Sequence, residues 1–271
     1  MKFIYLMFLL FFAIGCKKDK NPIPPPVTVA PVLVKDIVHQ NLPSPYYHFQ
    51  YDSAGRVKRA EFSSGLAMYD ISWEQNRLIE MKNTVMVNKD RLSYEYDASG
   101  RPVVVRIADE AGNVYRRAFL SYDAASRLKE MEWEVRITGI GFAKEQAYSF
   151  TYHPDGNLAN LRDERIFIDG VQNAAVYTDQ FELYDTKPNA DGFSLIHTTD
   201  RHLVLLPGVI LQKNNAGKII RSGDGTNYRI NYTMVYNNKN LPVQKNGEME
   251  ITSGPAAGTK LTLGTQISFY D

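Results

Sequence analysis

One short segment of the chain combines residue types that bind metal ions. His197, Asp200 and His202 lie within six positions of one another, and converging imidazole and carboxylate groups can hold a divalent cation. The segment falls in a predicted turn between two strands, where a pair of histidines is commonly solvated. We adopt this second interpretation, so the sequence predicts no metal site and no cofactor.

Three carboxylates recur at alternate positions of one predicted strand, namely Glu130, Glu132 and Glu134. A glycosidase needs two carboxyl groups about 5 to 9 Å apart across a cleft, whereas alternate residues of a strand point the same way. Pairing with basic residues on neighbouring strands, such as Arg116 or Lys144, explains the row without catalysis.

Other signatures of enzymes and of nucleic-acid binding are weak. Residues 222–226 are rich in glycine but lack the lysine of a phosphate-binding loop, so they predict a turn. The 31 basic and 30 acidic residues nearly cancel, which removes the long-range field that a nucleic-acid partner requires. The sequence predicts a protein that is neither an enzyme nor a nucleic-acid binder, with a dispersed catalytic site as an alternative.

The N-terminal region has the pattern of an export signal. Lys2 precedes an apolar run at 3–14, and the single cysteine of the chain follows at position 16. The residues at 13–16, Ala-Ile-Gly-Cys, resemble the lipobox of bacterial lipoproteins, and the Cys-Lys-Lys-Asp start is similar to lipoproteins of the Bacteroidota. The resemblance implies acylation of Cys16 and attachment to the outer membrane, at its periplasmic face or at the cell surface.

These signals divide the chain into three parts. Residues 1–15 are the expected lipoprotein signal peptide, and 16–31 are the lipidated cysteine with a proline-rich tether. Residues 32–271 form the expected folded domain. No further cysteine is present for disulfides, so this domain must be stabilised by packing.

A short phrase recurs along this domain. Tyr51, Tyr96 and Tyr122 each open a Tyr-Asp phrase that ends in arginine four residues after the aspartate, and weaker echoes start at Trp73, Tyr152, Asn214 and Tyr236. Aspartate and glycine at these positions are typical of tight hairpin turns, whereas Ser126 in place of glycine predicts a looser turn. The turn-forming residues predicted in this way are Asp52, Gly55, Arg56, Asp97, Gly100, Arg101, Asp123, Arg127, Asp155 and Gly156.

Apolar and polar residues alternate between the turns, as a half-buried strand requires. Met131, Trp133 and Val135 fall on one side of a predicted strand, and the Glu130 to Glu134 row falls on the other. With turns this close together, the pattern predicts an all-β fold, an antiparallel up-and-down meander of Tyr-Asp hairpins.

The Tyr-Asp phrases resemble the YD repeats of Rhs and teneurin shells. Their use in a short lipoprotein is similar to a Bacteroidota family of unknown function with a porin-like β fold. The resemblance implies an open or barrel-like curled sheet, without the many repeats that enclose a cocoon, and it carries over no catalytic residue.

Three roles are compatible with such a domain besides dispersed catalysis. The leading hypothesis is a non-enzymatic scaffold that binds a glycan or an envelope protein. The alternative is a carrier that holds a lipid or other apolar ligand on a concave, tyrosine-lined face of the sheet. The third is a small transmembrane barrel, which the charges within many strands disfavour.

Overall fold

The computed structural model of the protein describes residues 32–85, 89–168, 171–190, 193–197 and 202–271. Val32–Asp271 forms one compact unit. Cys16, the predicted signal peptide, the predicted tether and Asp200 lie outside the described residues. The described residues contain no helix that is long and apolar enough to cross a bilayer.

The described domain is built from antiparallel strands, as the sequence predicts. The strands are β1 (Val34–His39), β2 (Tyr47–Tyr51), β3 (Val57–Phe62), β4 (Ala67–Glu74), β5 (Arg77–Asn83), β6 (Arg91–Tyr96), β7 (Pro102–Ala108), β8 (Val114–Tyr122), β9 (Leu128–Ile137), β10 (Gly141–Tyr152), β11 (Leu158–Ile168), β12 (Val171–Pro188), β13 (Phe193–His197), β14 (Leu203–Pro207), β15 (Asn214–Gly223), β16 (Tyr228–Tyr236), β17 (Pro242–Ile251) and β18 (Lys260–Phe269).

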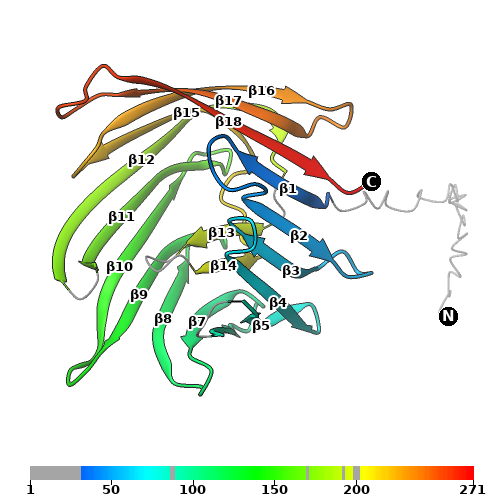
Figure 1. Ribbon diagram of the computed structural model, residues 1–271, viewed down its shortest axis with the longest axis vertical. Helices are drawn as coiled ribbons and strands as arrows, with labels where there is room; N and C mark the ends of the chain where they lie inside the picture. Colours follow the sequence, from blue (N-terminus) through cyan, green and yellow to red (C-terminus); the bar gives the residue numbers. More distant parts are fainter. Residues whose placement is uncertain (1–31, 86–88, 169–170, 191–192, 198–201) are drawn as a thin grey trace, which may run out of the picture. The chain divides into compact units, whose positions relative to one another are not determined.

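Sixteen of these strands form a closed up-and-down barrel, and β13 and β14 form a separate hairpin (Figure 1). The first and last strands close the barrel, with Ile37 opposite Ile267 and His39 opposite Thr265. Of the open and barrel-like forms that the sequence left possible, the closed barrel is therefore the one found. Closure removes the free strand edges that an open sheet would expose.

The Tyr-Asp turns lie together at one end of the barrel, called here the turn end. Each strand of a meander reverses the direction of the last, so the turns after β2, β4, β6, β8, β10 and β16 share one rim. Val34 pairs with Phe269 at the same rim. The described chain therefore enters and leaves the barrel at the turn end.

Alternation decides which side chains fill the barrel. Met131 and Trp133 point inward and are buried, whereas Glu132 and Glu134, which alternate with them, face outward. The same alternation places charged pairs on the outer wall, including Arg59 with Asp70 at 2.7 Å. The core is therefore inside the barrel, and the wall carries cross-strand ion pairs towards solvent.

The β13–β14 hairpin, called here the plug, is inserted between β12 and β15. The four residues from Leu203 to Leu206 are all fully buried, which requires apolar neighbours on both sides of the strand. Figure 1 shows the hairpin within the ring of strands. The uniform hairpin repeat did not predict this insertion.

Candidate functional site

The predicted turn residues build one geometry several times over. In the turn at Asp123, the carboxylate accepts the backbone N–H groups of Ala125 and Arg127, each at 2.9 Å, and pairs with the Arg127 side chain at 2.7 Å. The turns at Asp52 with Arg56 and at Asp97 with Arg101 repeat these bonds. These contacts hold the pKa of each aspartate below its usual value, chiefly through the arginine N–H groups.

The glycine positions of these turns all have left-handed backbone conformations. Gly55, Gly100 and Gly156 have φ of 75°, 79° and 89°, a region that glycine enters without steric cost. Ser126 occupies the equivalent position at φ 62° and donates its N–H to the Asp123 carbonyl at 2.9 Å. The expectation of a looser turn at Ser126 was wrong, because the aspartate bonds hold a non-glycine residue in the same conformation.

The turn at Gly156 differs in its first residue. His153, and not Asp155, occupies the position that Asp123 has in its own turn. The His153 N–H donates to the Asn157 carbonyl at 2.8 Å, as the Asp123 N–H donates to the Arg127 carbonyl. Asp155 instead accepts the Asn157 N–H at 2.9 Å. The His153 ring lies 2.9 Å from the carbonyl oxygen of Phe181 on β12, so this turn is attached to its neighbour through the histidine.

The aromatic residue that opens each phrase links it to the phrase before. The Tyr152 hydroxyl donates to the Leu128 carbonyl at 2.7 Å, and the Arg127 guanidinium stacks on the Tyr152 ring. Burial raises the pKa of Tyr152 to about 12, which keeps its hydroxyl a donor. The aromatics that repeat the bond to a preceding carbonyl are Tyr51, Trp73, Tyr96, Tyr122 and Tyr184.

Tyr184 and Asp185 form a further Tyr-Asp phrase that the sequence analysis missed. The Asp185 carboxylate accepts the backbone N–H of Lys187 at 3.1 Å, as the Asp123 carboxylate accepts that of Ala125. The second N–H that Asp185 accepts belongs to Asn215, at 3.1 Å, which follows the plug in the sequence. Lys187 then lies 3.7 Å from the Tyr236 ring centre. The plug is thus an insertion into one Tyr-Asp turn.

This insertion explains one incorrect prediction. The segment beginning at Asn214 was expected to be a turn, whereas it starts strand β15. Its turn lies upstream at Asp185, on the far side of the plug. The interval between Tyr122 and Tyr152, repeated once more along the sequence after Tyr152, leads close to Tyr184.

The histidines of the supposed metal segment anchor the plug. His202 is 2% exposed, and its Nε2 lies 3.1 Å from the Asp90 carboxylate and 3.0 Å from the Tyr115 hydroxyl. His197 stacks on Tyr47, whose hydroxyl lies 2.7 Å from Nε2. The expectation of solvated loop histidines was wrong, because His202 is buried and His197 contacts Tyr47. The described residues contain no group of three or more potential metal ligands.

The carboxylate row lies on the outer wall. Lys144 pairs with Glu132 at 3.0 Å, as the sequence suggested, and Arg117 pairs with Glu134. Arg116 does not pair with this row, because it points inward and binds the buried Glu145 at 2.7 Å. The row is therefore part of the cross-strand ion pairs of the wall.

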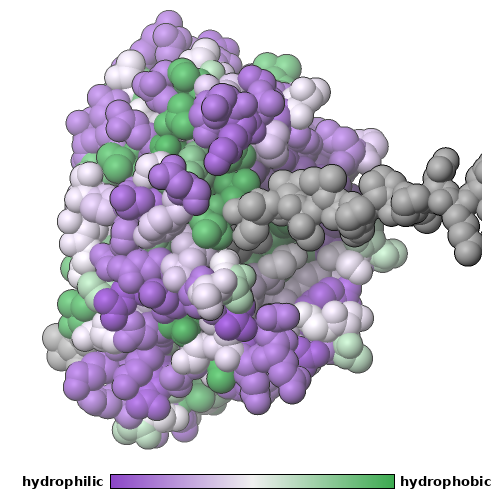
Figure 2. Space-filling view, turned by 90° about the vertical axis from the view of Figure 1, so that its right-hand side faces the viewer, coloured by the Kyte–Doolittle hydropathy of each residue, from purple (hydrophilic) through white to green (hydrophobic). Residues whose placement is uncertain are grey.

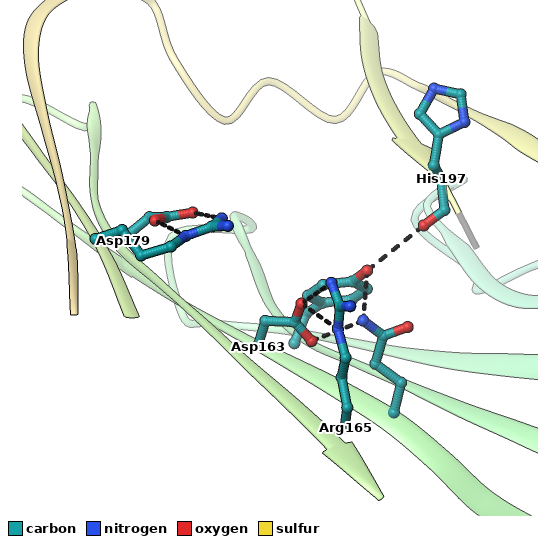
Figure 3. Close-up of polar contacts among 7 residues, drawn as sticks. Asp163, Arg165, Asp179 and His197 are labelled. Atoms are coloured by element: carbon teal, nitrogen blue, oxygen red, sulfur yellow. Dashed lines mark hydrogen bonds and ion pairs between the residues drawn. The ribbon is translucent and has the colours of Figure 1, made fainter. Parts of the chain in front are cut away.

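A cluster of polar side chains lies inside the barrel on β10, β11, β12 and β15 (Figure 3). Asp163 accepts from Arg165 at 2.9 Å and from the Gln146 amide at 2.6 Å, and Asp179 binds Arg221 through two hydrogen bonds. Each carboxylate has its own guanidinium, so the cluster is neutral overall and its charges are satisfied internally.

A cavity lies between the plug and the wall formed by β1, β11, β12 and β15 to β18. Its volume is about 790 Å³, within the usual range for small-molecule sites. Much of the lining is apolar, including Leu158, Leu161, Phe181, Leu195, Leu211 and Leu263. Polar groups are also present, including His39, Gln40, Asn189, Ser194, Tyr232 and Lys245.

Lys245 and His39 are the basic groups of this lining. The Lys245 ammonium lies 3.9 Å from the centre of the Tyr232 ring, and His39 Nδ1 lies 2.9 Å from the Thr265 hydroxyl. Burial, and secondarily the charge of Lys245, lowers the pKa of His39. A cavity with an apolar body and a basic group on one wall can bind an elongated small molecule.

Comparisons with known proteins support the fold. Searches with the sequence match no family model and no curated protein. Similar crystal structures include a porin-like protein from Bacteroides uniformis, with 13% identity, a TM-score of 0.53 and coverage of 83% of this chain and 89% of that one. They also include a porin-like protein from Bacteroides vulgatus, with 11% identity, a TM-score of 0.57 and coverage of 88% of this chain and 99% of that one. At these identities the similarity shows a shared fold, so the chain has a porin-like β-barrel fold.

Proposed function

We propose that the protein is a non-enzymatic, lipid-anchored envelope protein whose barrel carries a small, largely apolar ligand. The observation that supports this proposal is the 790 Å³ cavity between the plug and the barrel wall. The carrier hypothesis had placed the ligand on a concave sheet face, and closure of the sheet turns that face into the cavity lining. Apolar side chains around such a space favour an apolar ligand, since binding removes its surface from water.

The outer wall favours a barrel that lies outside the bilayer. A transmembrane barrel carries an outward apolar band about 25 Å tall, whereas the wall here has charged pairs such as Arg59 with Asp70 and Arg229 with Glu250. Figure 2 shows one face of the domain as mainly hydrophilic, with hydrophobic side chains in patches among the polar ones. A wall of this kind argues against the transmembrane hypothesis.

Membrane attachment is assigned in this proposal to acylated Cys16. The first described residue, Val32, leads directly into β1 at the turn end, so an anchor before it is joined to that end. The outer membrane is the proposed location, at the periplasmic face or the cell surface. Binding of a glycan or an envelope protein to the outer wall stays a prediction.

Binding of a neutral fluorescent probe tests the carrier proposal. The chain from residue 16, carrying C16S, is purified without detergent, stripped of lipid and titrated with N-phenyl-1-naphthylamine. We expect saturable fluorescence enhancement, which the substitution Leu263→Trp in the cavity lining reduces at least about tenfold in affinity. Leu261→Trp, on the same strand but 46% exposed and outside the lining, is the matched control. Equal binding by both variants, or no binding by the parent chain, would contradict the proposal.

A further inference from the structure

The cavity has a chemical polarity that the proposed function does not use. Two of the described residues that line it, Lys245 and His39, carry basic side chains. In a partly apolar enclosure, charges interact more strongly than in water. The lining therefore favours a ligand with negative charge at one place and apolar surface elsewhere.

The two basic groups and a hydroxyl between them lie in a row across three neighbouring strands. In the register of the sheet, Thr265 on β18 is opposite both His39 on β1 and Lys245 on β17. All three line the cavity, and the His39 ring is already joined to the Thr265 hydroxyl. An ammonium, a hydroxyl and an imidazole are thus side by side, which is a suitable set of hydrogen-bonding groups for a carboxylate.

A glycine places the lysine against an aromatic ring. Gly247 is opposite Tyr232 in the register of β16 and β17, and a Cβ atom at Gly247 would lie 2.7 Å from the Tyr232 ring. The missing side chain therefore lets the ring lie over β17, where it contacts the Lys245 ammonium. This contact holds the charged end of Lys245 at the cavity wall.

Apolar lining lies beside this row, at Ile37 and Leu263, and also continues onto other strands. Leu158 and Leu161 belong to β11, Phe181 to β12 and Ala216 to β15. These strands are separated from the row at β17, β18 and β1 by β16 in the barrel order. The cavity therefore offers apolar surface that extends away from the row, as the chain of an amphiphile requires.

We propose that the ligand of this cavity is a long-chain carboxylate, with its headgroup at Lys245 and Thr265 and its chain against Leu158, Leu161 and Phe181. This inference rests on the proposed function, because it names the chemical class that the carrier binds. Lys245 supplies the positive charge, and His39 acts as a neutral hydrogen-bonding group, because its pKa is lowered by burial and by Lys245.

Competition between ligands of equal chain length tests the headgroup. Dodecanoic acid, dodecan-1-ol and dodecylamine are each used to displace N-phenyl-1-naphthylamine from the lipid-free chain, residues 16–271 with C16S, at pH 7.5. We expect the acid to displace the probe at a concentration about tenfold lower than the alcohol, which corresponds to about 1.4 kcal/mol, and the amine to be the weakest competitor.

Variants of Lys245 test whether this residue causes the preference for the acid over the alcohol. Lys245→Met should bring the acid and the alcohol to equal potency, and saturable binding of N-phenyl-1-naphthylamine by this variant shows that the cavity is intact. Lys245→Arg should keep the preference for the acid, and Lys260→Met on β18, outside the lining, is the control for net charge.

The outcomes separate the inference from the function on which it rests. Equal displacement by the acid and the alcohol in the parent chain, or preference for the amine, would overturn the headgroup assignment and leave the carrier function standing. Retention of the acid preference in Lys245→Met would also overturn it. Absence of probe binding altogether would contradict the carrier function itself.

Discussion

The guanidinium carbon of Arg127 lies 4.5 Å from the centre of the Tyr152 ring, so the last residue of one Tyr-Asp phrase stacks on the first residue of the next. The Tyr152 hydroxyl makes a second contact with the earlier phrase, because it donates a hydrogen bond to the Leu128 carbonyl. Arg101 stacks on Tyr122 in the same way, at 4.6 Å. The phrase therefore forms a turn and also joins neighbouring hairpins around the turn end.

Removing the contacts of Tyr152 should destabilise the barrel by a modest amount. The contributions of its hydrogen bond and of its stacked ring can be measured separately. Tyr152→Phe deletes one hydrogen bond and is expected to lower the free energy of unfolding by about 0.5–1.5 kcal/mol. Tyr152→Leu also deletes the stacked ring, and a double-mutant cycle with Arg127→Gln should give a coupling of about 0.5–1 kcal/mol. Urea unfolding followed by tryptophan fluorescence measures both. A coupling indistinguishable from zero would show that the stacking is incidental.

Protonation of the turn aspartates should weaken the fold in acid. The folded-state pKa of Asp123 is below its usual value, so its contribution is complete above the ordinary aspartate pKa of about 3.9. That contribution is lost as pH falls through the lower, folded-state pKa. We expect the difference in unfolding free energy between the parent chain and Asp123→Asn to be largest at pH 6 and to shrink towards pH 2. A constant difference over this range would contradict the role of the charge.

The plug should depend on the buried pair of His202 and Asp90. The pair is almost completely buried, and loss of the histidine removes its contacts with Asp90 and with the hydroxyls of Tyr69 and Tyr115 in the core. His202→Ala should therefore cost about 3–5 kcal/mol and increase hydrogen exchange in β14. His48→Ala is the control, since its pair with Asp36 is partly exposed, and it should cost about 1 kcal/mol or less. Equal effects of the two variants would argue against the anchoring role of His202.

Membrane association should depend on Cys16. Acyl chains contribute about 0.8 kcal/mol per buried CH₂ group, so a Cys16→Ser variant expressed in a bacterium that processes lipoproteins should leave the membrane fraction or accumulate as the unprocessed precursor. Immunoblotting of cell fractions measures this. A Cys16→Ser protein of mature size that still fractionates with membranes would show that the anchor lies elsewhere.

Local features of the fold were accessible from the sequence. The bonds of Asp123 reach only two and four residues along the chain, so the turn can be recognised from a short phrase. The alternation of Met131 and Trp133 with the glutamates likewise follows from the twofold period of a strand. These short-range causes determined the strand pattern and the antiparallel meander, which the structure confirms.

Features that join distant residues were decided only by the tertiary structure. Barrel closure pairs His39 with Thr265, the plug places His202 beside Asp90, and the cavity combines residues from β1 to β18. None of these contacts has a local signal, because each depends on strand number, strand tilt and the space left inside the closed wall. The sequence alone thus determined how each hairpin forms, whereas the closed barrel decided which side chains share one cavity.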